Sequence, residues 1–128
     1  MHEPTVAIIA ALHEASGIIG DKGKIPWKCE EDMLHFKAET MERPVIMGRK
    51  TWESLPEKKL PGRKIIVLSK TLEQVPNGVT LVHEIGRALY IGRDYAKQMG
   101  SDIFFIAGGG KIYQEFMGYA EMLYLTFI

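Results

Sequence analysis

Short, continuously apolar runs alternate along the chain with longer amphipathic stretches. Runs of this kind are typical of strands that are buried on both faces, as in a parallel sheet covered by helices. Strands are therefore predicted at residues 5–12, 43–48, 63–70, 79–83, 102–107 and 121–128. Helices are predicted at residues 30–41, 85–99 and 111–118, with a short one opening at residue 49. The alternation predicts an α/β fold with a mainly parallel central sheet flanked by helices.

The composition narrows the class of protein. The chain has 128 residues, 46% hydrophobic and 25% charged, which suits one domain with a substantial core. Its 16 basic residues balance 16 acidic ones, which argues against a nucleic-acid or membrane-surface role. Cys29 is the only cysteine, so we expect no internal disulfide and no cysteine-based zinc site. The first apolar run is too short to span a bilayer and lacks a basic lead-in, so a cytoplasmic protein is expected.

A candidate proton-handling site lies in residues 25–37. Pro26 fixes its own φ and disfavours helix at Ile25, so the segment opens as a loop. Asp32 then falls at the edge of the apolar face of the predicted helix. Partial burial would raise the pKa of this carboxyl group, as general acid catalysis requires. The alternative interpretation is that Asp32 belongs to a solvated acidic helix start.

A glycine-rich loop precedes this site. Gly17, Gly20 and Gly23 punctuate residues 14–24, which is typical of a segment that is able to change shape. Ile18 and Ile19 form an apolar island within the loop. We expect them to contact either the core or a ligand.

Cations and hydroxyl groups follow two of the predicted strands. Residues 48–51 place a glycine, two cations and a threonine at a helix start, where backbone N–H groups favour anions. Ser69 and Lys70 end the next strand. Because ligands of parallel sheets gather at the carboxyl ends of the strands, these segments predict one polyanion site. The alternative is a solvated pair of cations with Thr51 as a helix cap.

A third candidate site is the turn Gly108-Gly109-Gly110 between a predicted strand and a predicted helix. Glycine at such a turn allows a pyrophosphate to approach the N-terminus of the helix. The spacing is not the G-x-G-x-x-G dinucleotide fingerprint, so it is weak support for a Rossmann fold.

Several segments carry a resemblance that extends along the whole chain. In order, they are Ile25-Pro26-Trp27 with Asp32, Val45-Ile46-Met47-Gly48-Arg49-Lys50-Thr51-Trp52, Leu60-Pro61-Gly62-Arg63, Ile106-Ala107-Gly108-Gly109-Gly110 and Leu123-Tyr124-Leu125-Thr126. Together they resemble dihydrofolate reductase. The resemblance implies NADPH-dependent reduction of 7,8-dihydrofolate to 5,6,7,8-tetrahydrofolate, with hydride transfer to pterin C6 and protonation at N5. It also implies binding of antifolates such as trimethoprim and methotrexate.

The resemblance implies roles for individual residues at the substrate site. Asp32 would hydrogen-bond the pterin and assist protonation, with Trp27 bridged to it by water. Tyr113 would lie near the nicotinamide, and Arg63 would bind the glutamate α-carboxylate as a bidentate pair. The other substrate-binding residues would be Ile9, Ala10, Met33, Phe36, Leu55, Ala107 and Thr126.

The resemblance also implies a cofactor site. Its residues would be Ala11, Ile19, Gly20, Gly48, Arg49, Lys50, Thr51, Ser69, Lys70, Gly108, Gly109, Gly110, Lys111 and Ile112. Residues 49–50 and 69–70 would hold the 2′-phosphate that distinguishes NADPH from NADH. Residues 108–111 would cradle the pyrophosphate, with a non-proline cis peptide between Gly108 and Gly109. Residues 17–28 would form a mobile loop over the nicotinamide. No metal is implied.

The family pattern implies one domain over residues 1–128, with an adenosine-binding part at about 43–101. Ala107 stands where a bulkier aliphatic residue is usual, so a roomier pterin pocket is expected, and Phe127 stands where a polar residue is more familiar. Two C-terminal strands of the family fold are expected to be missing, which would leave an apolar sheet edge unpaired after residues 121–128. The full-length form is expected to be monomeric, and this chain to pair through that edge and to fold only marginally alone.

Two alternative functions stay open. A riboflavin-pathway pyrimidine reductase would share the glycine turn and the NADPH pocket, although the spacing of Pro26-Trp27 and Asp32 favours folate. A non-catalytic or weakly active fragment would bind nucleotide or antifolate and need a complementing segment.

Overall fold

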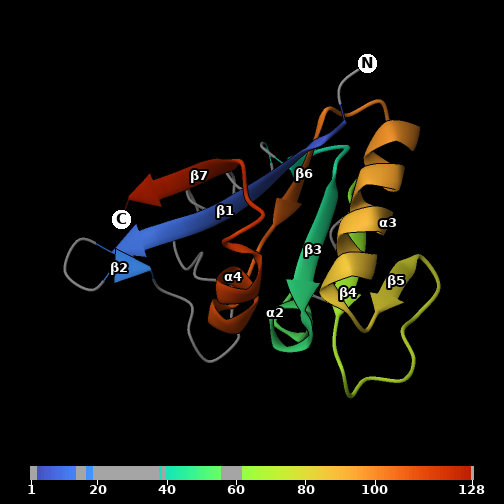
Figure 1. Ribbon diagram of the computed structural model, residues 1–128. Coiled ribbons are helices and arrows are strands. Elements are labelled where there is room, and N and C mark those ends of the chain that lie inside the picture. Colours follow the sequence, from blue (N-terminus) through green and yellow to red (C-terminus); the bar gives the residue numbers. More distant parts are fainter. Residues whose placement is uncertain (1–2, 14–16, 19–37, 39, 56–61, 128) are drawn as a thin grey trace.

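The computed structural model describes residues 3–13, 17–18, 38, 40–55 and 62–127. Strands and helices alternate through these residues (Figure 1). The strands are β1 (Thr5–His13), β2 (Gly17–Ile18), β3 (Pro44–Gly48), β4 (Lys64–Leu68), β5 (Val79–Val82), β6 (Ile103–Ile106) and β7 (Met122–Phe127). The helices are α2 (Arg49–Glu53), α3 (Ile85–Gln98) and α4 (Gly110–Phe116).

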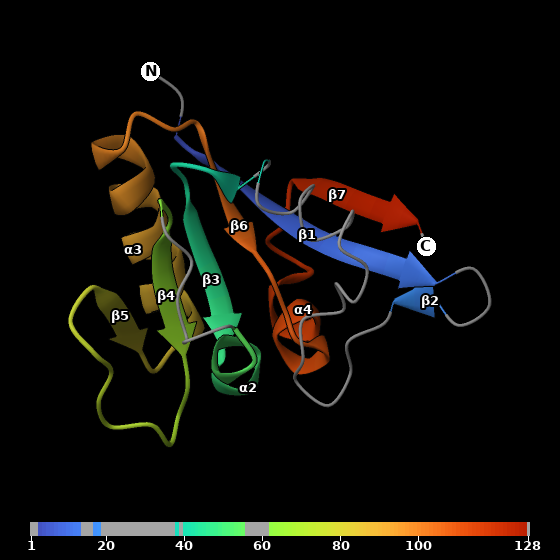
Figure 2. The ribbon, with the colours of Figure 1, turned by 180° about the vertical axis from the view of Figure 1, so that it is seen from behind.

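The strands form one sheet in the order β7-β1-β6-β3-β4-β5. Every pairing along this path is parallel, whereas β2 pairs antiparallel with the end of β1. The predicted α/β fold with a mainly parallel sheet is therefore confirmed. Because β6 enters between β1 and β3, the glycine turn after β6 lies beside the start of α2, as Figures 1 and 2 show.

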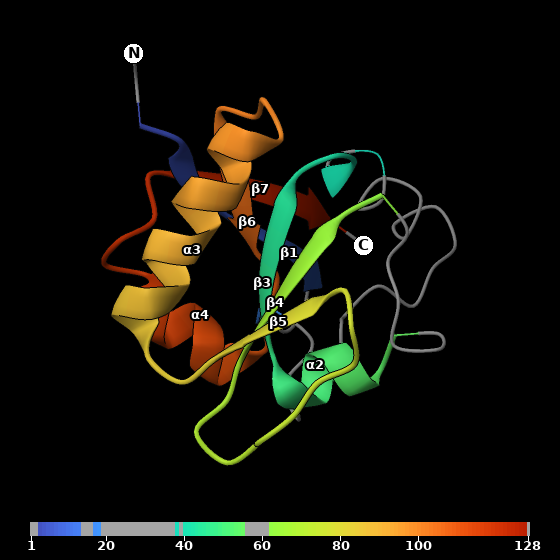
Figure 3. The same ribbon diagram turned by 90° about the vertical axis from the view of Figure 1, so that its right-hand side faces the viewer.

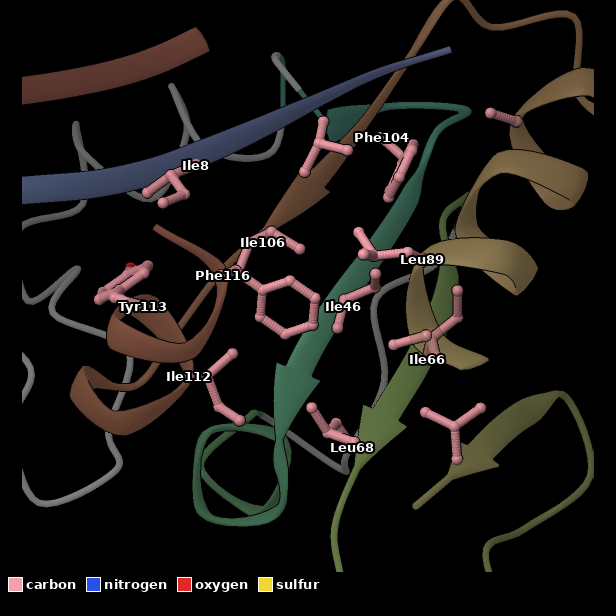
Figure 4. Packing of buried hydrophobic residues seen from close by; sticks show 14 residues of the cluster. Ile8, Ile46, Ile66, Leu68, Leu89, Phe104, Ile106, Ile112, Tyr113 and Phe116 are labelled. Atoms are coloured by element: carbon pink, nitrogen blue, oxygen red, sulfur yellow. The ribbon is translucent and has the colours of Figure 1, made fainter. Parts of the chain in front are cut away.

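Two hydrophobic clusters cover the two faces of the sheet. Alternate strand residues such as Ile8, Ile46 and Phe104 pack with residues of α3 and α4 on one face (Figure 4). Their sequence neighbours, including Ile9 and Phe105, pack with Trp52 and Leu55 on the other face. Figure 3 shows α3 and α4 on one side of the strands and α2 on the other. Burial on both faces explains why the strands read as continuous apolar runs.

Three local predictions differ from the structure. Residues 14–24 were expected to be loop throughout, but Gly17 and Ile18 form β2, in which Ile18 pairs with Leu12. The strand predicted at residues 63–70 ends at Leu68, because the Ser69 hydroxyl accepts the backbone N–H groups of Thr71 and Leu72 in a turn. The N-cap of α2 is Gly48, so the interpretation of Thr51 as the cap is wrong. The helix predicted at residues 30–41 lies mostly outside the described residues.

Gly92 allows α3 to approach the sheet closely. A Cβ atom at Gly92 would lie 2.6 Å from Phe104 Cδ2 and 3.3 Å from Ile46 Cδ1. We expect Gly92→Ala to lower the free energy of unfolding by about 1–3 kcal/mol, because overpacking outweighs the better helix propensity of alanine. Urea unfolding measures the change.

Gly86→Ala is the matched control in the same helix. A Cβ atom at Gly86 would have no neighbour within 4 Å. This variant should keep the stability of the wild type or gain up to about 1 kcal/mol. Equal effects of the two substitutions would contradict the packing explanation for Gly92.

Candidate cofactor and substrate sites

A groove of about 710 Å³ opens at the carboxyl ends of β3, β4 and β5, between α2 and α4. This is the edge of the sheet at which the arrowhead of β3 runs into α2 (Figure 1). The groove is lined by Gly48, Arg49, Lys50, Thr51, Leu68, Ser69, Lys70, Thr71, His83, Glu84, Ile85, Gly109, Gly110, Lys111, Ile112 and Glu115. The structure therefore brings the two predicted cationic segments and the glycine turn to one place.

Sequence reasoning missed several residues of this groove, namely Leu68, Thr71, His83, Glu84, Ile85 and Glu115. A signal for some of them was present. Residues 83–85 follow the predicted strand at 79–83, so the rule about carboxyl ends of strands applies to them as well. Glu115 lies four positions after Lys111 and thus on the same side of a helix.

Glycine residues bring the floor of the groove together. The Gly48 N–H donates to the Gly108 carbonyl oxygen at 2.9 Å, which joins the end of β3 to the turn after β6. A Cβ atom at Gly48 would lie 3.0 Å from Ile112 Cγ1, so any larger residue here would crowd the side chain of Ile112 on α4. Gly108 has a φ of 111°, a value that favours glycine. The peptide between Gly108 and Gly109 is cis, as the resemblance implies.

The groove carries more positive than negative side chains. Its charged residues are the cations Arg49, Lys50, Lys70 and Lys111 and the acids Glu84 and Glu115. Arg49 Nη1 lies 3.1 Å from Glu53 Oε1, and both side chains of this pair are 39% exposed. An exposed ion pair of this kind contributes little to stability. An anion in the groove could therefore take the place of Glu53 at Arg49 with little loss of free energy.

Tyr113 joins two strands next to the groove. Its hydroxyl lies 2.8 Å from the Ile9 carbonyl oxygen and 3.1 Å from that of Ala107, and donates to them. Figure 4 shows its ring on α4. The residue is only 4% exposed, and burial raises the pKa of its hydroxyl well above the usual value. The hydroxyl therefore stays protonated and joins the middle of β1 to the residue that follows β6.

Three of the predicted substrate-binding residues meet in one cluster. Ile9, Leu55 and Ala107 are buried together on the α2 face of the sheet. Arg63 is half-buried, and its Nε donates to the hydroxyl of the buried Thr40 at 3.1 Å. Burial lowers the pKa of the Arg63 guanidinium from its ordinary value. The structure thus buries three of the predicted substrate-binding residues in one cluster and ties the guanidinium of a fourth, Arg63, to Thr40.

Other predicted site residues are described only in part or not at all. Ala10 and Ala11 lie in β1, and the backbone of Ala11 pairs with that of Thr126 in β7. The remaining ones lie outside the described residues: Ile19, Gly20, Trp27, Asp32, Met33 and Phe36. Within the described ranges, no group of three or more acidic, histidine or cysteine side chains is arranged to hold a metal. No helix in this part of the chain is long and apolar enough to cross a membrane.

Comparison with known proteins places these features in a family. The family model for dihydrofolate reductase matches residues 5–128. The chain belongs to the dihydrofolate reductase family. Dihydrofolate reductase of Buchnera aphidicola is 42% identical over 123 residues, which cover 96% of this chain and 71% of the relative. The type 3 enzyme of Salmonella typhimurium is 38% identical, with the same two coverages.

Solved structures of dihydrofolate reductases share the fold. The enzyme from Enterococcus faecalis, complexed with NADP(H) and RAB-propyl, superimposes with a TM-score of 0.80 at 28% identity. The enzyme from Schistosoma mansoni gives a TM-score of 0.80 at 33% identity. The alignments cover 98% of this chain and 71% and 74% of those two chains. The resemblance to dihydrofolate reductase is thus confirmed, and the chain is an oxidoreductase of folate metabolism.

The buried hydroxyl of Tyr113 makes the free energy of unfolding depend on pH in the alkaline range. Above about pH 10 the unfolded state loses the tyrosine proton while the folded state keeps it, so stability falls as pH rises. We expect Tyr113→Phe to lower the free energy of unfolding by about 1–3 kcal/mol at pH 8, because two buried carbonyl groups lose a donor. Urea unfolding at pH 8 and pH 11 should show a smaller penalty at the higher pH. An unchanged penalty would contradict this account.

Proposed function

We propose that this chain catalyses the NADPH-dependent reduction of 7,8-dihydrofolate to 5,6,7,8-tetrahydrofolate, with hydride transfer to pterin C6 and protonation at N5. The observation that carries the proposal is the groove at the carboxyl ends of the parallel strands, where most of the predicted cofactor residues meet. Membership of the dihydrofolate reductase family favours this reaction over the reduction of a riboflavin-pathway pyrimidine.

The residues of the groove fit a dinucleotide. Four cations and three hydroxyl-bearing residues, Thr51, Ser69 and Thr71, line it together with glycines that leave room for a ligand close to the backbone. Such a set matches the phosphates of NADPH, since charged groups and exposed backbone are what phosphate recognition uses. The complex of the related Enterococcus faecalis enzyme with NADP(H) supports the same reading.

We assign the parts of the groove to parts of the cofactor. Arg49 and Lys50 on α2, with Ser69 and Lys70 after β4, bind the 2′-phosphate. Residues 108–111 face the pyrophosphate, and Gly48, Thr51 and Ile112 complete the wall. Ala11, Ile19 and Gly20 contact the nicotinamide end. The adenosine-binding part of the single domain is then residues 43–101, which supply most of the groove.

The bound cofactor supplies the hydride, and the protein positions the reactants. Tyr113 fixes the carbonyl groups of Ile9 and Ala107. The nicotinamide is proposed to bind beside them. Its hydroxyl stays neutral at physiological pH, so it acts by hydrogen bonding rather than by proton transfer.

The substrate is proposed to lie on the α2 face of the sheet. Ile9, Leu55 and Ala107 pack in one buried cluster there. The pterin is proposed to lie against this cluster, with the small side chain of Ala107 giving it extra room. Arg63, whose Nε is anchored by Thr40, binds the α-carboxylate of the glutamate. Asp32 assists protonation at N5, with Trp27 and Thr126 ordering a bridging water. Ala10, Met33 and Phe36 complete the pocket.

The experiment that tests this function follows deuterium. The purified chain is given dihydrofolate and NADPH that carries deuterium at the transferable position of C4. Product that carries deuterium at C6 of tetrahydrofolate is expected, and NADH should react more slowly than NADPH. A parallel reaction with a known dihydrofolate reductase serves as the control. If that reaction labels C6 and the reaction with this chain gives no labelled product, the proposal is overturned.

A further inference from the structure

A side-chain hydrogen bond joins Thr40 and Arg63, which are 23 positions apart in the sequence. The Arg63 Nε–H donates to the Thr40 hydroxyl oxygen at 3.1 Å. Thr40 is fully buried, whereas Arg63 is only half-buried. A hydroxyl that is fixed in the interior therefore restrains a guanidinium that is partly accessible to a ligand.

The backbone holds the two residues close together independently of this bond. The Thr40 carbonyl oxygen accepts the Arg43 N–H at 3.1 Å, and the Glu42 N–H donates to the Gly62 carbonyl oxygen at 2.9 Å. The chain turns sharply at both places, because Glu42 has a φ of 58° and Gly62 a φ of 83°. Loss of the Thr40 hydroxyl alone should therefore leave residues 40 and 63 next to each other.

The contact with Thr40 limits how the guanidinium can pair with a carboxylate. An arginine carries one N–H on Nε and four on its two Nη atoms. Because Thr40 accepts the Nε–H, a carboxylate that binds as a bidentate pair meets N–H groups of the Nη atoms. A guanidinium that is already restrained loses less rotational freedom when it binds a ligand, which favours binding.

We propose that Thr40 is a positioning residue for recognition of the substrate's α-carboxylate. It holds the fork of Arg63 in one orientation before the substrate binds, so the chain prefers folates with a free α-carboxylate over analogues that lack this group. Thr40 acts through Arg63 and does not touch the reacting atoms. This inference rests on the proposed function, because it takes Arg63 as the residue that binds the carboxylate.

The test compares two ligands that differ only in this group, 7,8-dihydrofolate and its α-carboxamide. Fluorescence titration gives the Kd of each for the purified chain. The wild type should bind the carboxamide about 10–150-fold more weakly, which corresponds to the loss of a hydrogen bond to a charged group. In Thr40→Val, which keeps the shape of threonine without its hydroxyl, this ratio should fall by about 3–10-fold.

Two further variants separate positioning from a purely structural role. Thr40→Ser retains the hydroxyl and should restore the ratio of the wild type. In an Arg63→Gln background, Thr40→Val should not lower the ratio further, because the guanidinium that Thr40 restrains is absent. A purely structural role of Thr40 would instead weaken the binding of both ligands equally and leave the ratio unchanged.

A measurement on the wild type covers the case in which Thr40→Val does not fold. Nuclear magnetic resonance follows the exchange of the Arg63 Nε–H with solvent, and the signal is assigned by its loss in Arg63→Lys. Exchange should be slower than for exposed arginines such as Arg87, both before and after dihydrofolate is added. An Nε–H that becomes protected only when dihydrofolate binds would show that the ligand orients the guanidinium, and would overturn the inference.

The outcomes distinguish this inference from the proposed function. If the chain reduces dihydrofolate but Thr40→Val shows the ratio of the wild type, the role of Thr40 is overturned and the function stands. If the wild type binds both ligands equally, Arg63 does not recognise the α-carboxylate, and the inference is overturned while the reduction stands. If neither ligand binds to the folded chain, both proposals are overturned.

Discussion

Replacing Asp32 by asparagine should lower the single-turnover rate of hydride transfer to dihydrofolate by roughly two to four orders of magnitude near pH 7. Asparagine keeps the shape of the side chain but cannot assist protonation at N5. NADPH binding should be unchanged, because the groove proposed to hold the cofactor is built from other segments. Asp32 itself lies outside the described residues, so its role rests on the family resemblance and on its place in the predicted helix.

Among the described residues, no carboxylate is fully buried. The fully buried polar side chains in this part of the chain are Thr40 and Thr51, neither of which can hold a negative charge. Glu84 and Glu115 line the groove proposed for the cofactor, and not the apolar cluster of Ile9, which is the proposed substrate wall. Loss of Asp32 should therefore leave protonation to solvent, and the rate of the variant should rise as pH falls.

Glu31→Gln is the matched control for this prediction. It removes a neighbouring carboxylate from the same predicted helical turn, and the rate should stay within about twofold of the wild type. Rapid mixing of the NADPH complex with dihydrofolate gives the rates of both variants. A wild-type rate for Asp32→Asn near pH 7 would remove Asp32 from the mechanism.

The fold could be predicted from the sequence because the apolar runs that mark its strands are local patterns. Residues 5–12 and 102–107 read as buried strands, and β1 and β6 occupy them with side chains packed on both faces. The groove was predictable for a related reason. A parallel sheet brings the carboxyl ends of its strands to one edge, so the cations Arg49, Lys50 and Lys70 were expected at that edge, and they line one groove there.

Contacts between distant segments could not be predicted in this way. The Tyr113 hydroxyl reaches the Ile9 carbonyl across a separation of 104 residues, and no local pattern marks either partner. The pair of Gly92 and Phe104 is similar, because the glycine reads only as a weak helix position until the sheet lies beneath it. In the sequence, His83 is only the end of a predicted strand. Its contact with the Ser69 carbonyl oxygen becomes apparent only in the structure.

Replacing Arg49 by leucine should weaken the binding of NADPH by about 1.5–3 kcal/mol, or roughly 10–150-fold in Kd. The binding of NADH should be nearly unchanged. The reason is that a guanidinium at the start of α2, beside Lys50 and Lys70 in the same groove, can form charge-assisted hydrogen bonds with the 2′-phosphate. NADH lacks that group. Titration of both cofactors by nicotinamide fluorescence measures the difference, which should shrink at high salt.

The ion pair of Arg49 with Glu53 provides a control for this substitution. Arg49→Leu removes both the cation and this pair, whereas Glu53→Gln removes the pair and keeps the cation. Because the pair is exposed, Glu53→Gln should not weaken NADPH, and it should slightly strengthen binding by releasing Arg49 from a competing carboxylate. If Arg49→Leu weakens the binding of NADPH and NADH equally, Arg49 positions the adenosine and does not recognise the 2′-phosphate. If Glu53→Gln reproduces the loss seen with Arg49→Leu, the ion pair shapes the groove, and the cation is not its main phosphate ligand.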